Sequence, residues 1–444
     1  MDVLDSVITS DTHTILLRPR PFARAAGRLV LLPLLPHRHA TKPLPAEVWE
    51  RVLRYVFAQY EECLPNIDVE TWKQGLLLIC KDLKDVALPL YYENVHVNAL
   101  YRLERFTNVV YAADQRWDSI RRTPYSAPGR WVQTLDLSDL RCGLWSEVYH
   151  VDTLLVRLLP LLPFLAELIL NSTILISRRF IDGLCNREGN DKLVSLKGVK
   201  LASSADLTLD DPFISVLRCC RNLVELEIHG SGIEPLLSDG HIQPTEWDHV
   251  SFKPLQLPQL RRLAVISMHC STVFVALLHS ALPSLRHLTV TPYDDIPIPS
   301  SLVPRFIETH GAELTSLHLF TPKSWPTMLF PSPTTLLQTC PKLNHLSLEN
   351  PLPVLALSST RPQHSLQLLS IPRPDAGFYK ILEALLPKMP ALKAVRARDV
   401  RWLRAGMSSH AREAGVQGEM RDWRQRLARR RIVMLDGAWQ PGEI

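Results

Sequence analysis

The side chains of this chain that could do chemistry are scattered and form no catalytic or metal-binding motif. The sequence contains no GxxxxGK(S/T) phosphate loop, no GxSxG nucleophile turn, no HExxH motif and no EF-hand loop. The eight cysteines, at positions 63, 80, 142, 185, 219, 220, 270 and 340, form no CxxC pair and no compact His/Cys cluster with zinc spacing. We therefore predict no catalytic residue, no metal and no cofactor, and we predict that the protein is not an enzyme.

Composition narrows the class of partner. The chain has 50 basic and 45 acidic residues, so its net charge of +5 does not indicate a nucleic-acid or membrane surface. The longest apolar stretch, Leu154 to Ile176, is interrupted by Arg157, Pro160, Pro163 and Glu167, which a membrane span does not readily accept. Scattered cysteines are typical of a reducing compartment. We expect a protein partner, no nucleic acid, no membrane, and a location in the cytoplasm or nucleus.

The first 42 residues show no regular pattern. The start, MDVLDSVITS, carries two Asp residues and no basic segment, so it is a poor secretory signal. Residues 15–40 are rich in Arg and free of acidic side chains, as a mitochondrial targeting peptide would be, but four prolines interrupt the basic run. We favour a disordered leader over residues 1–42.

A leucine pattern recurs through the second two-thirds of the chain. The motif apolar-x-x-apolar-x-apolar begins at residues 132, 165, 223, 260, 285, 314, 343 and 366, with weaker copies at 193 and 392. Successive copies start 23 to 37 residues apart, mostly in or just above the range of leucine-rich repeats. In five copies a proline stands two residues before the leucine that begins the motif, where it ends a helix and favours extended backbone. These segments are LPFL, LPQL, LPSL, CPKL and MPAL.

Each copy of the motif predicts a short strand, followed by a loop and a helix. Helices are indicated upstream of the prolines, for example at residues 271–281 and 379–386. One such unit cannot bury its apolar face alone, but about ten stacked units share a core. We predict an α/β fold in which residues 131–417 form a curved leucine-rich-repeat solenoid of about ten irregular repeats, with strands on the concave side and helices on the convex side. An ordinary α/β domain is the alternative.

The last segment, residues 418–444, is predicted to cap the solenoid with a basic helix and a final strand. The helix carries an apolar stripe at Met420, Trp423 and Leu427. We interpret the basic side of this helix as a solvated face. The alternative is a nuclear-localisation or phosphate-binding patch. The basic residues are Arg426, Arg429, Arg430 and Arg431.

Two helices are predicted ahead of the repeats. In residues 44–57 apolar side chains recur at helical spacing, with a proline in the first turn. A second helix is predicted over residues 72–88, ending at Pro89. Two short helices bury only a small core, so this module, residues 43–97, needs a neighbour or a partner to be stable. Residues 98–130 are predicted to form a helical linker between the module and the repeats.

Two segments of residues 43–97, LPAEVWERVLRYV and LLLICKDLKDVALPLYYENV, resemble the F-box that precedes leucine-rich repeats in fungal proteins. The resemblance implies a small helical F-box-like module that docks on the Skp-family adaptor of an SCF-type cullin–RING ubiquitin ligase, while the repeats bind an unknown protein substrate. It implies that the chain is the substrate-receptor subunit of that ligase. The positions that match the family's adaptor-contacting or supporting residues are Leu44, Pro45, Val48, Val52, Leu53, Leu78, Cys80 and Leu83.

The connector at residues 57–75 is longer than is usual in that family. It leaves open which of residues 76–79 face outward. In an alternative interpretation, the two helices only cap the solenoid, and the chain is a leucine-rich-repeat interaction scaffold without any ligase association.

Candidate substrate-binding residues lie between the leucines of the motif, because these positions face the concave surface. An acidic partner segment would find complementary charge there. The insertions at residues 229–254 and 291–301 are alternative binding elements, since loops on a rigid scaffold often carry recognition. The predicted substrate-binding positions are Arg261, Arg262, Arg286, His287, His318, His345 and Arg396.

Overall fold

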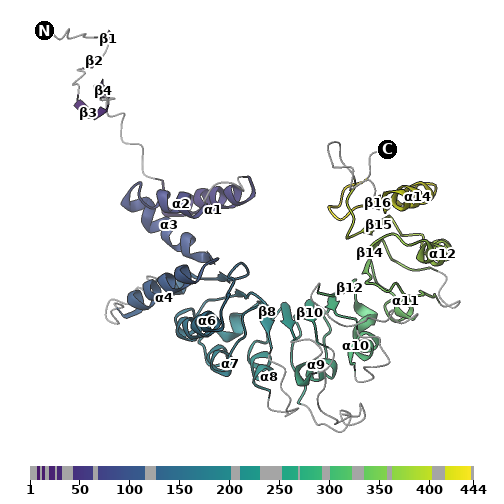
Figure 1. Ribbon diagram of the computed structural model, residues 1–444. Helices are drawn as coiled ribbons and strands as arrows, with labels where there is room; N and C mark the ends of the chain where they lie inside the picture. Colours follow the sequence, from purple (N-terminus) through teal and green to yellow (C-terminus); the bar gives the residue numbers. More distant parts are fainter. Residues whose placement is uncertain are drawn as a thin grey trace. The chain divides into compact units, whose positions relative to one another are not determined.

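The computed structural model divides the chain into two compact units, residues 1–90 and 91–444 (Figure 1). No helix among the described residues is both long and apolar enough to span a membrane. The structure describes residues 8–10, 13–15, 20–25, 28–32, 44–63, 69–115, 127–201, 211–230, 253–268, 271–292, 301–322, 335–357, 363–402 and 416–441.

The first unit begins with two antiparallel strand pairs. Strand β1 (Ile8–Ser10) pairs with β2 (His13–Ile15), and β3 (Arg20–Ala25) pairs with β4 (Arg28–Leu32). These short strands lie within the segment that the sequence analysis expects to be a disordered leader. Only two residues separate the strands of each pair, the length of a tight hairpin, and β-branched residues in β1 and β2 favour extended backbone.

Three helices form the rest of the first unit: α1 (Ala46–Cys63), α2 (Val69–Leu76) and α3 (Lys81–Glu93), of which the last crosses into the second unit. Helix α1 confirms the first predicted helix. The backbone carbonyl of Pro45 accepts the N–H groups of Val48 at 3.0 Å and Trp49 at 3.2 Å, so the proline starts the helix as expected.

The second predicted helix, residues 72–88, is wrong in two respects. A turn at residues 77–80 separates α2 from α3, and α3 continues through Pro89 instead of ending there. Proline removes one helical hydrogen bond, but the flanking side chains of Ala87 and Leu90 are buried in the core of this unit. Tertiary packing thus overrides the local stop signal. The core of the unit consists of Leu53, Phe57, Ala87 and Leu90, with Leu76, Leu77, Leu83 and Val86 packed around them.

The second unit contains a twelve-stranded parallel sheet in which every strand pairs with the next one in the sequence. All ten copies of the leucine motif contain a strand, as predicted. The strands are β5 (Asn94–His96), β6 (Thr134–Asp136), β7 (Glu167–Ile169), β8 (Ser195–Lys200), β9 (Glu225–His229), β10 (Arg262–Ile266), β11 (His287–Val290), β12 (Ser316–Leu319), β13 (His345–Ser347), β14 (Leu368–Ile371), β15 (Ala394–Ala397) and β16 (Val433–Leu435).

The sheet starts earlier than the sequence pattern indicates. Strand β5 lies inside the segment predicted as the N-terminal module, and its Val95 is the register partner of Leu135 in β6. The segment predicted as a linker holds α4 (Leu100–Gln115), whose Leu103 and Val110 are buried in the core of the second unit. A three-residue strand without a leucine motif is too short to stand out in the sequence.

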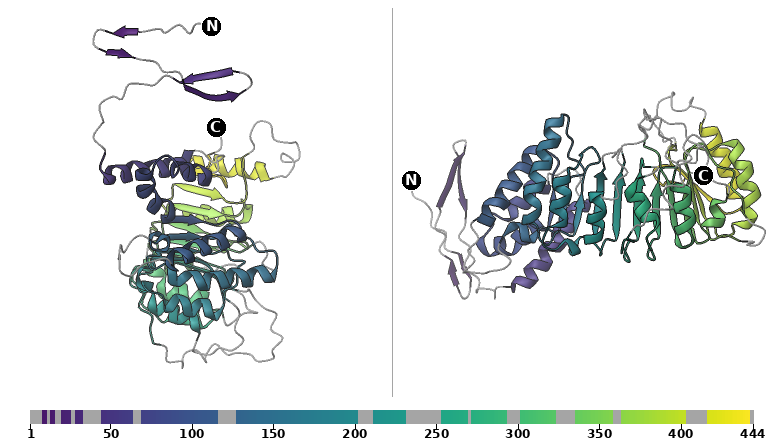
Figure 2. Two further views of the ribbon diagram at one scale, coloured as in Figure 1. Left: turned by 90° about the vertical axis from the view of Figure 1, so that its left-hand side faces the viewer. Right: turned by 90° about the horizontal axis from the view of Figure 1, so that it is seen from below.

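Helices lie along one side of the sheet and connect successive strands (Figures 1 and 2). The predicted helices at residues 271–281 and 379–386 are confirmed by α9 and α12. After α4 the helices are α5 (Pro128–Trp131), α6 (Trp145–Leu158), α7 (Arg178–Cys185), α8 (Pro212–Cys219), α9 (Thr272–Leu278), α10 (Val303–His310), α11 (Leu336–Thr339), α12 (Ala376–Leu385) and α14 (Val416–Ala428). Short 3-10 helices are η1 (Leu159–Leu161), η2 (Asn190–Lys192), η4 (Gly311–Glu313) and η5 (Leu386–Lys388).

One buried side chain from each of the eleven strands β6 to β16 forms a ladder across the sheet. The register pairs these residues directly, and none is more than 2% exposed. In a close-packed core, truncating such a leucine to alanine costs about 2–5 kcal/mol. The ladder consists of Leu135, Leu168, Leu196, Leu226, Leu263, Leu288, Leu317, Leu346, Leu369, Val395 and Met434.

Gly198 permits an irregularity in β8. The register between β8 and β9 shifts between Leu196 and Val199, and Gly198 has a φ of 70°, in the left-handed region that favours glycine. A Cβ atom at this position would collide with the backbone carbonyl oxygen of Leu170 in the neighbouring segment.

We expect Gly198→Ala to lower the free energy of unfolding by about 3 kcal/mol, because backbone strain adds to the clash. Urea unfolding followed by circular dichroism measures the change. Gly183→Ala in α7 is the matched control, because the nearest atom to its Cβ lies at an ordinary 3.8 Å, and we expect it to be neutral or slightly stabilising. Equal stability of the two variants would contradict the assignment of strain to Gly198.

The C-terminal segment packs against the last strands of the sheet. Met420, Trp423 and Leu427 of α14 are buried, as their spacing predicts, and β16 pairs in parallel with β15. The buried carboxylate of Asp436 accepts backbone N–H groups from Trp402, Ala438 and Gln440 at 2.8–3.1 Å.

Candidate protein-interaction surfaces

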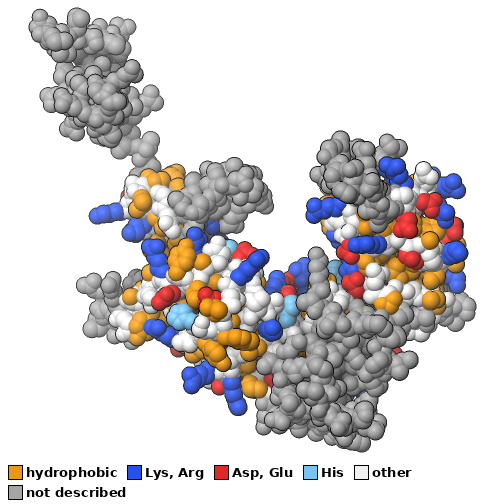
Figure 3. Space-filling model, viewed as in Figure 1, with side chains coloured by type: hydrophobic (Ala, Val, Ile, Leu, Met, Phe, Trp, Pro, Cys, Tyr) orange, Lys and Arg blue, Asp and Glu red, His pale blue; other side chains and the backbone are white. Residues whose placement is uncertain are grey.

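Helix α1 presents apolar side chains to solvent on one face. Leu44, Val48 and Val52 are 51%, 40% and 42% exposed, and Tyr55 on the same face is also exposed. Residues 48, 52 and 55 recur at spacings of four and three, so they share one side of the helix. We call Leu44, Val48, Val52 and Tyr55 the α1 surface. Hydrophobic side chains are visible over the first helical unit in Figure 3.

The predicted adaptor-binding residues in α1 and just before it divide between the solvent-exposed side and the core. Leu44, Pro45, Val48 and Val52 are exposed, whereas Leu53 is 4% exposed and packs in the core. Leu53 thus supports the helix from inside. The sequence analysis did not select Tyr55, although its position seven residues after Val48 places it on the same helix face.

The turn between α2 and α3 adds a second exposed apolar segment. Leu78 is 85% exposed, and Ile79 and Cys80 are exposed as well. Leu76 and Leu77 pack against the core, and so does Leu83 in α3. The open question about residues 76–79 is answered: the first two face inward and the last two face outward.

The exposed face of the parallel sheet carries two rows of side chains that alternate with the buried ladder. Arg262, His287 and His345 belong to one row, in which the register runs from Glu225 through Arg262, His287 and Ser316 to His345. His318 and Arg396 belong to the next row, two residues further along the strands. We call these two rows the strand face.

Glu225 joins two cations on the strand face. Its carboxylate lies 2.5 Å from Lys197 Nζ and 2.5 Å from Arg262 Nη1. Burial raises the pKa of Glu225, but the hydrogen bonds and charges of Lys197 and Arg262 outweigh burial and hold the pKa below its usual value. The carboxylate therefore neutralises part of the charge that the sequence analysis assigned to substrate binding.

Arg261 and Arg286 do not lie in the same row as Arg262. Each is one residue before its strand, and neighbouring strand positions point to opposite sides. Arg286 Nη1 donates to the backbone carbonyl of Glu313 at 3.2 Å and lies 3.3 Å from its carboxylate, while Arg261 is exposed.

Arg396 holds the C-terminal turn. Its Nη2 donates to the backbone carbonyl of Gly437 at 2.6 Å, and its guanidinium lies 4.0 Å from the ring centroid of Trp439. This contact joins the last turn of the chain to β15. The other predicted substrate positions on the strand face are not part of this contact. They are Arg262, His287, His318 and His345.

Four side chains form a hydrogen-bonded chain across β12, β13 and β14. Ser316 Oγ lies 3.0 Å from His318 Nε2, which lies 3.0 Å from His345 Nδ1, and His345 Nε2 lies 2.9 Å from Ser370 Oγ. We call Ser316, His318, His345 and Ser370 the histidine relay. Burial lowers the pKa of His318, and burial together with His318, Arg396 and Arg398 lowers the pKa of His345 to about 4.

We expect the free energy of unfolding to fall as the pH decreases from about 6.5 to 4, because the unfolded chain then binds protons that folded His345 does not. Above pH 6.5 this contribution is fully present. For a partly exposed group the loss is about 2 kcal/mol. Urea unfolding at a series of pH values measures it, and His345→Gln is expected to show a shallower decrease. An unchanged acid slope in this variant would contradict the assignment to His345.

The arginines near the C-terminus differ in their surroundings. Arg426 pairs with Asp422 at 3.1 Å and lies over the ring of Tyr379 at 5.1 Å. The remaining three candidates of the basic patch are exposed: Arg429, Arg430 and Arg431.

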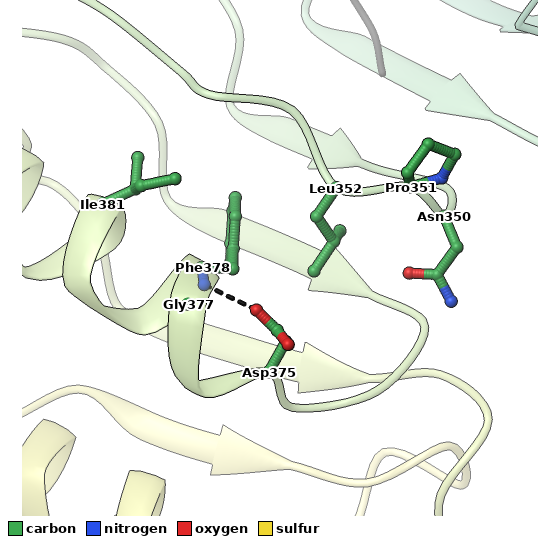
Figure 4. A pocket seen from close by; sticks show the side chains of 7 residues that line it. All are labelled: Asn350, Pro351, Leu352, Asp375, Gly377, Phe378 and Ile381. Atoms are coloured by element: carbon green, nitrogen blue, oxygen red, sulfur yellow. Dashed lines mark hydrogen bonds between the residues drawn. The ribbon is translucent and has the colours of Figure 1, made fainter. Parts of the chain in front are cut away.

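A hollow of about 410 Å³ lies between the segment after β13 and the start of α12 (Figure 4). Its apolar lining includes Leu352, Phe378 and Ile381. Asp375 Oδ1 accepts the backbone N–H of Phe378 at 2.6 Å and thereby caps α12. Because its charged residue serves as a helix cap, we assign no binding role to this hollow.

The described residues contain no group of three or more His, Cys, Asp or Glu side chains arranged to hold a metal ion. Burial raises the pKa values of Cys185, Cys220 and Cys340 to about 12, so these thiols are protonated at neutral pH and are poor nucleophiles. The insertions at residues 229–254 and 291–301 lie mostly outside the described residues. In the comparisons with known proteins, no family model and no curated protein matches the chain.

Proposed function

We propose that this chain is the substrate-receptor subunit of an SCF-type cullin–RING ubiquitin ligase. Its first helical unit would dock on a Skp-family adaptor, and its strand face would hold a protein substrate. The observation that carries the proposal is the division of the F-box-like positions. Leu44, Val48, Val52 and Leu78 are exposed, whereas Leu53 lies in the core of the same unit.

Exposed apolar side chains on a small unit favour a docking role over a purely structural one. Among the described residues, the core of this unit contains four buried apolar side chains. Further apolar surface lies outside this core, on α1 and on the turn before α3. A helix that served only to bury its stripe would not leave its valines 40% and 42% exposed. Apolar patches with polar surroundings are typical of protein-binding sites.

The finer architecture belongs to the same proposal. We infer that the parallel sheet and its helices form a curved leucine-rich-repeat solenoid with the strand face on the concave side. Three observations support this inference. The strand order follows the sequence, buried apolar residues share one register in successive strands, and the connecting helices lie on one side of the sheet.

In this role the protein supplies proximity and no chemistry of its own. It would hold a substrate near the ubiquitin-transferring subunits, which raises the effective concentration of the reacting groups. Free cysteines among the described residues are compatible with the cytoplasm or nucleus, where we propose that the ligase acts.

Co-expression of the full chain with a Skp-family adaptor tests the proposal. We expect a stable one-to-one complex on size-exclusion chromatography, and we expect a cullin to join when it is added. A chain that elutes alone in the presence of excess adaptor would instead support a leucine-rich-repeat scaffold without ligase association.

A further inference from the structure

The histidine relay leaves one ring nitrogen for a ligand. Two neutral imidazoles carry two N–H protons between them. If His318 Nε2 donates to His345 Nδ1, then His345 Nε2 donates to Ser370, and His318 Nδ1 is an acceptor. If His345 Nδ1 donates to His318 Nε2, then His318 Nδ1 carries a proton and is a donor. In both arrangements His318 Nδ1 has no hydrogen-bond partner among the described residues.

The charges around the relay create a positive potential. His287 on β11 faces His318 from one side, and Arg396 on β15 and Arg398 just after it act from the other. Glu349, which follows β13, pairs with Arg398 at 3.1 Å. The permanently charged groups that act on both histidines are Arg396 and Arg398, and their positive charge disfavours protonation of these histidines in the free protein.

The two arginines are held in place before any ligand arrives. Arg396 is fixed by Gly437 and Trp439, and Arg398 Nη2 donates to the backbone carbonyl of Leu348 at 2.8 Å. The Nε groups of both arginines are buried without a hydrogen-bond partner among the described residues. Fixed guanidinium groups bind anions at a low entropic cost.

We propose that the histidine relay, with Arg396 and Arg398, binds an anionic side chain of an acidic protein segment on the strand face. This inference rests on the proposed function and specifies the class of substrate. The anion is a carboxylate or a phosphate monoester, and His318 Nδ1 donates a hydrogen bond to it. The relay takes its second arrangement, in which His318 Nε2 accepts from His345 Nδ1 and Ser370 donates to His345 Nε2.

Binding of an anion also changes the protonation of the relay. A negative charge beside His318 favours the imidazolium form and offsets the field of the arginines. Proton uptake then accompanies binding, so the affinity increases as the pH falls. A rise of about one pKa unit on binding corresponds to a total affinity increase of about tenfold at most, reached at a pH below both pKa values.

Three fluorescent peptides test the proposal with the full chain. They have the same length and differ at four positions, which carry Gln, Glu or phosphoserine. We expect the Glu or the phosphoserine peptide to bind more tightly than the Gln peptide by about tenfold or more in fluorescence anisotropy. The tighter of the two identifies the source of the anion as carboxylate or phosphate. Equal affinity of all three peptides would overturn the proposal.

The pH arm uses the Glu peptide, because phosphoserine itself titrates near pH 6. We expect the affinity to increase by about threefold between pH 7.5 and 6.0. His318→Gln is expected to reduce the affinity about tenfold and to remove this increase, and Arg398→Gln is expected to weaken binding at every pH. Melting temperatures of both variants establish that they are folded.

His229→Gln is the matched control, because His229 lies on the same sheet but pairs with Glu227 outside the relay. We expect its affinity and pH dependence to equal those of the wild type. A His318→Gln variant that behaves like this control would refute the relay as a binding element.

The same variants separate this inference from the proposed function. Co-purification with the Skp-family adaptor should be unaffected by His318→Gln, since the α1 surface belongs to the other unit. Adaptor binding without any preference for acidic peptides would overturn only the relay. Acidic-peptide binding without adaptor binding would overturn only the ligase function.

Discussion

Replacing Val48 and Val52 together by glutamate is expected to abolish binding of the Skp-family adaptor without unfolding the chain. Both side chains are exposed, and glutamate is at least as good a helix former as valine, so the cost to folding is below about 1 kcal/mol. In an apolar interface, however, each carboxylate would lose its hydration without gaining a partner. We expect the affinity for the adaptor to fall by about 100-fold or more, equivalent to about 3 kcal/mol.

The measurement combines co-purification with thermal unfolding. Val109→Glu on α4 is the matched control, because Val109 is 41% exposed and belongs to the second unit. It should bind the adaptor like the wild type. Leu53→Ala serves as the opposite control, because this buried side chain should affect stability and binding together. Full-strength adaptor binding by the double variant would refute docking through the α1 surface.

Replacing Arg187 by methionine is expected to lower the free energy of unfolding by about 3 kcal/mol. Arg187 is 4% exposed, and its guanidinium donates to the backbone carbonyls of Leu162, Leu165 and Gly189, each at 3.2 Å. Methionine fills a similar volume but removes all three hydrogen bonds. The carbonyls of Leu162 and Gly189 then keep only the backbone N–H groups of Leu165 and Lys192 as donors. Removing a buried cation relieves its own desolvation, which offsets part of this cost.

Urea unfolding of the full chain measures the change. Arg179→Met in α7 is the matched control, because Arg179 is exposed, and we expect its stability to remain within about 0.5 kcal/mol of the wild type. Arg187→Lys should be intermediate, because one ammonium group does not have the forked geometry that serves three carbonyls. If Arg187→Met matched the control, the carbonyls would have found other donors, and Arg187 would not stabilise the junction between these segments.

The strands of the second unit were predictable because their signal is local. The motif apolar-x-x-apolar-x-apolar occurs ten times, and every copy contains a strand. The helices α9 and α12 and the apolar stripe of α14 follow from periodicity in the same way. Strand β5 was missed because its pairing with β6 depends on a neighbour some forty residues away.

Local signals failed where tertiary contacts outweighed them. Pro89 should end a helix, but the burial of Ala87 and Leu90 keeps α3 intact on both sides of it. The sequence analysis grouped Arg261 and Arg286 with Arg262 because all three lie between the leucines of the motif, although neighbouring residues of a strand face opposite ways. The sequence also gave no sign that Arg396 contacts the turn at Gly437 and Trp439, because that contact joins residues about forty positions apart.

By itself the sequence determined the repeating strands, the helices between them and an apolar stripe on residues 44–57. Periodicity carries this information, since it depends only on which side chains recur at the pitch of a helix or strand. Only the tertiary structure decided which side chains of the stripe are exposed to solvent, because the stripe is wider than the core that covers it. Leu53 and Phe57 are buried, whereas Val48 and Val52 remain exposed. It also brought His318 and His345 within hydrogen-bonding distance across two strands, which the register of the sheet decides and the spacing of the residues does not.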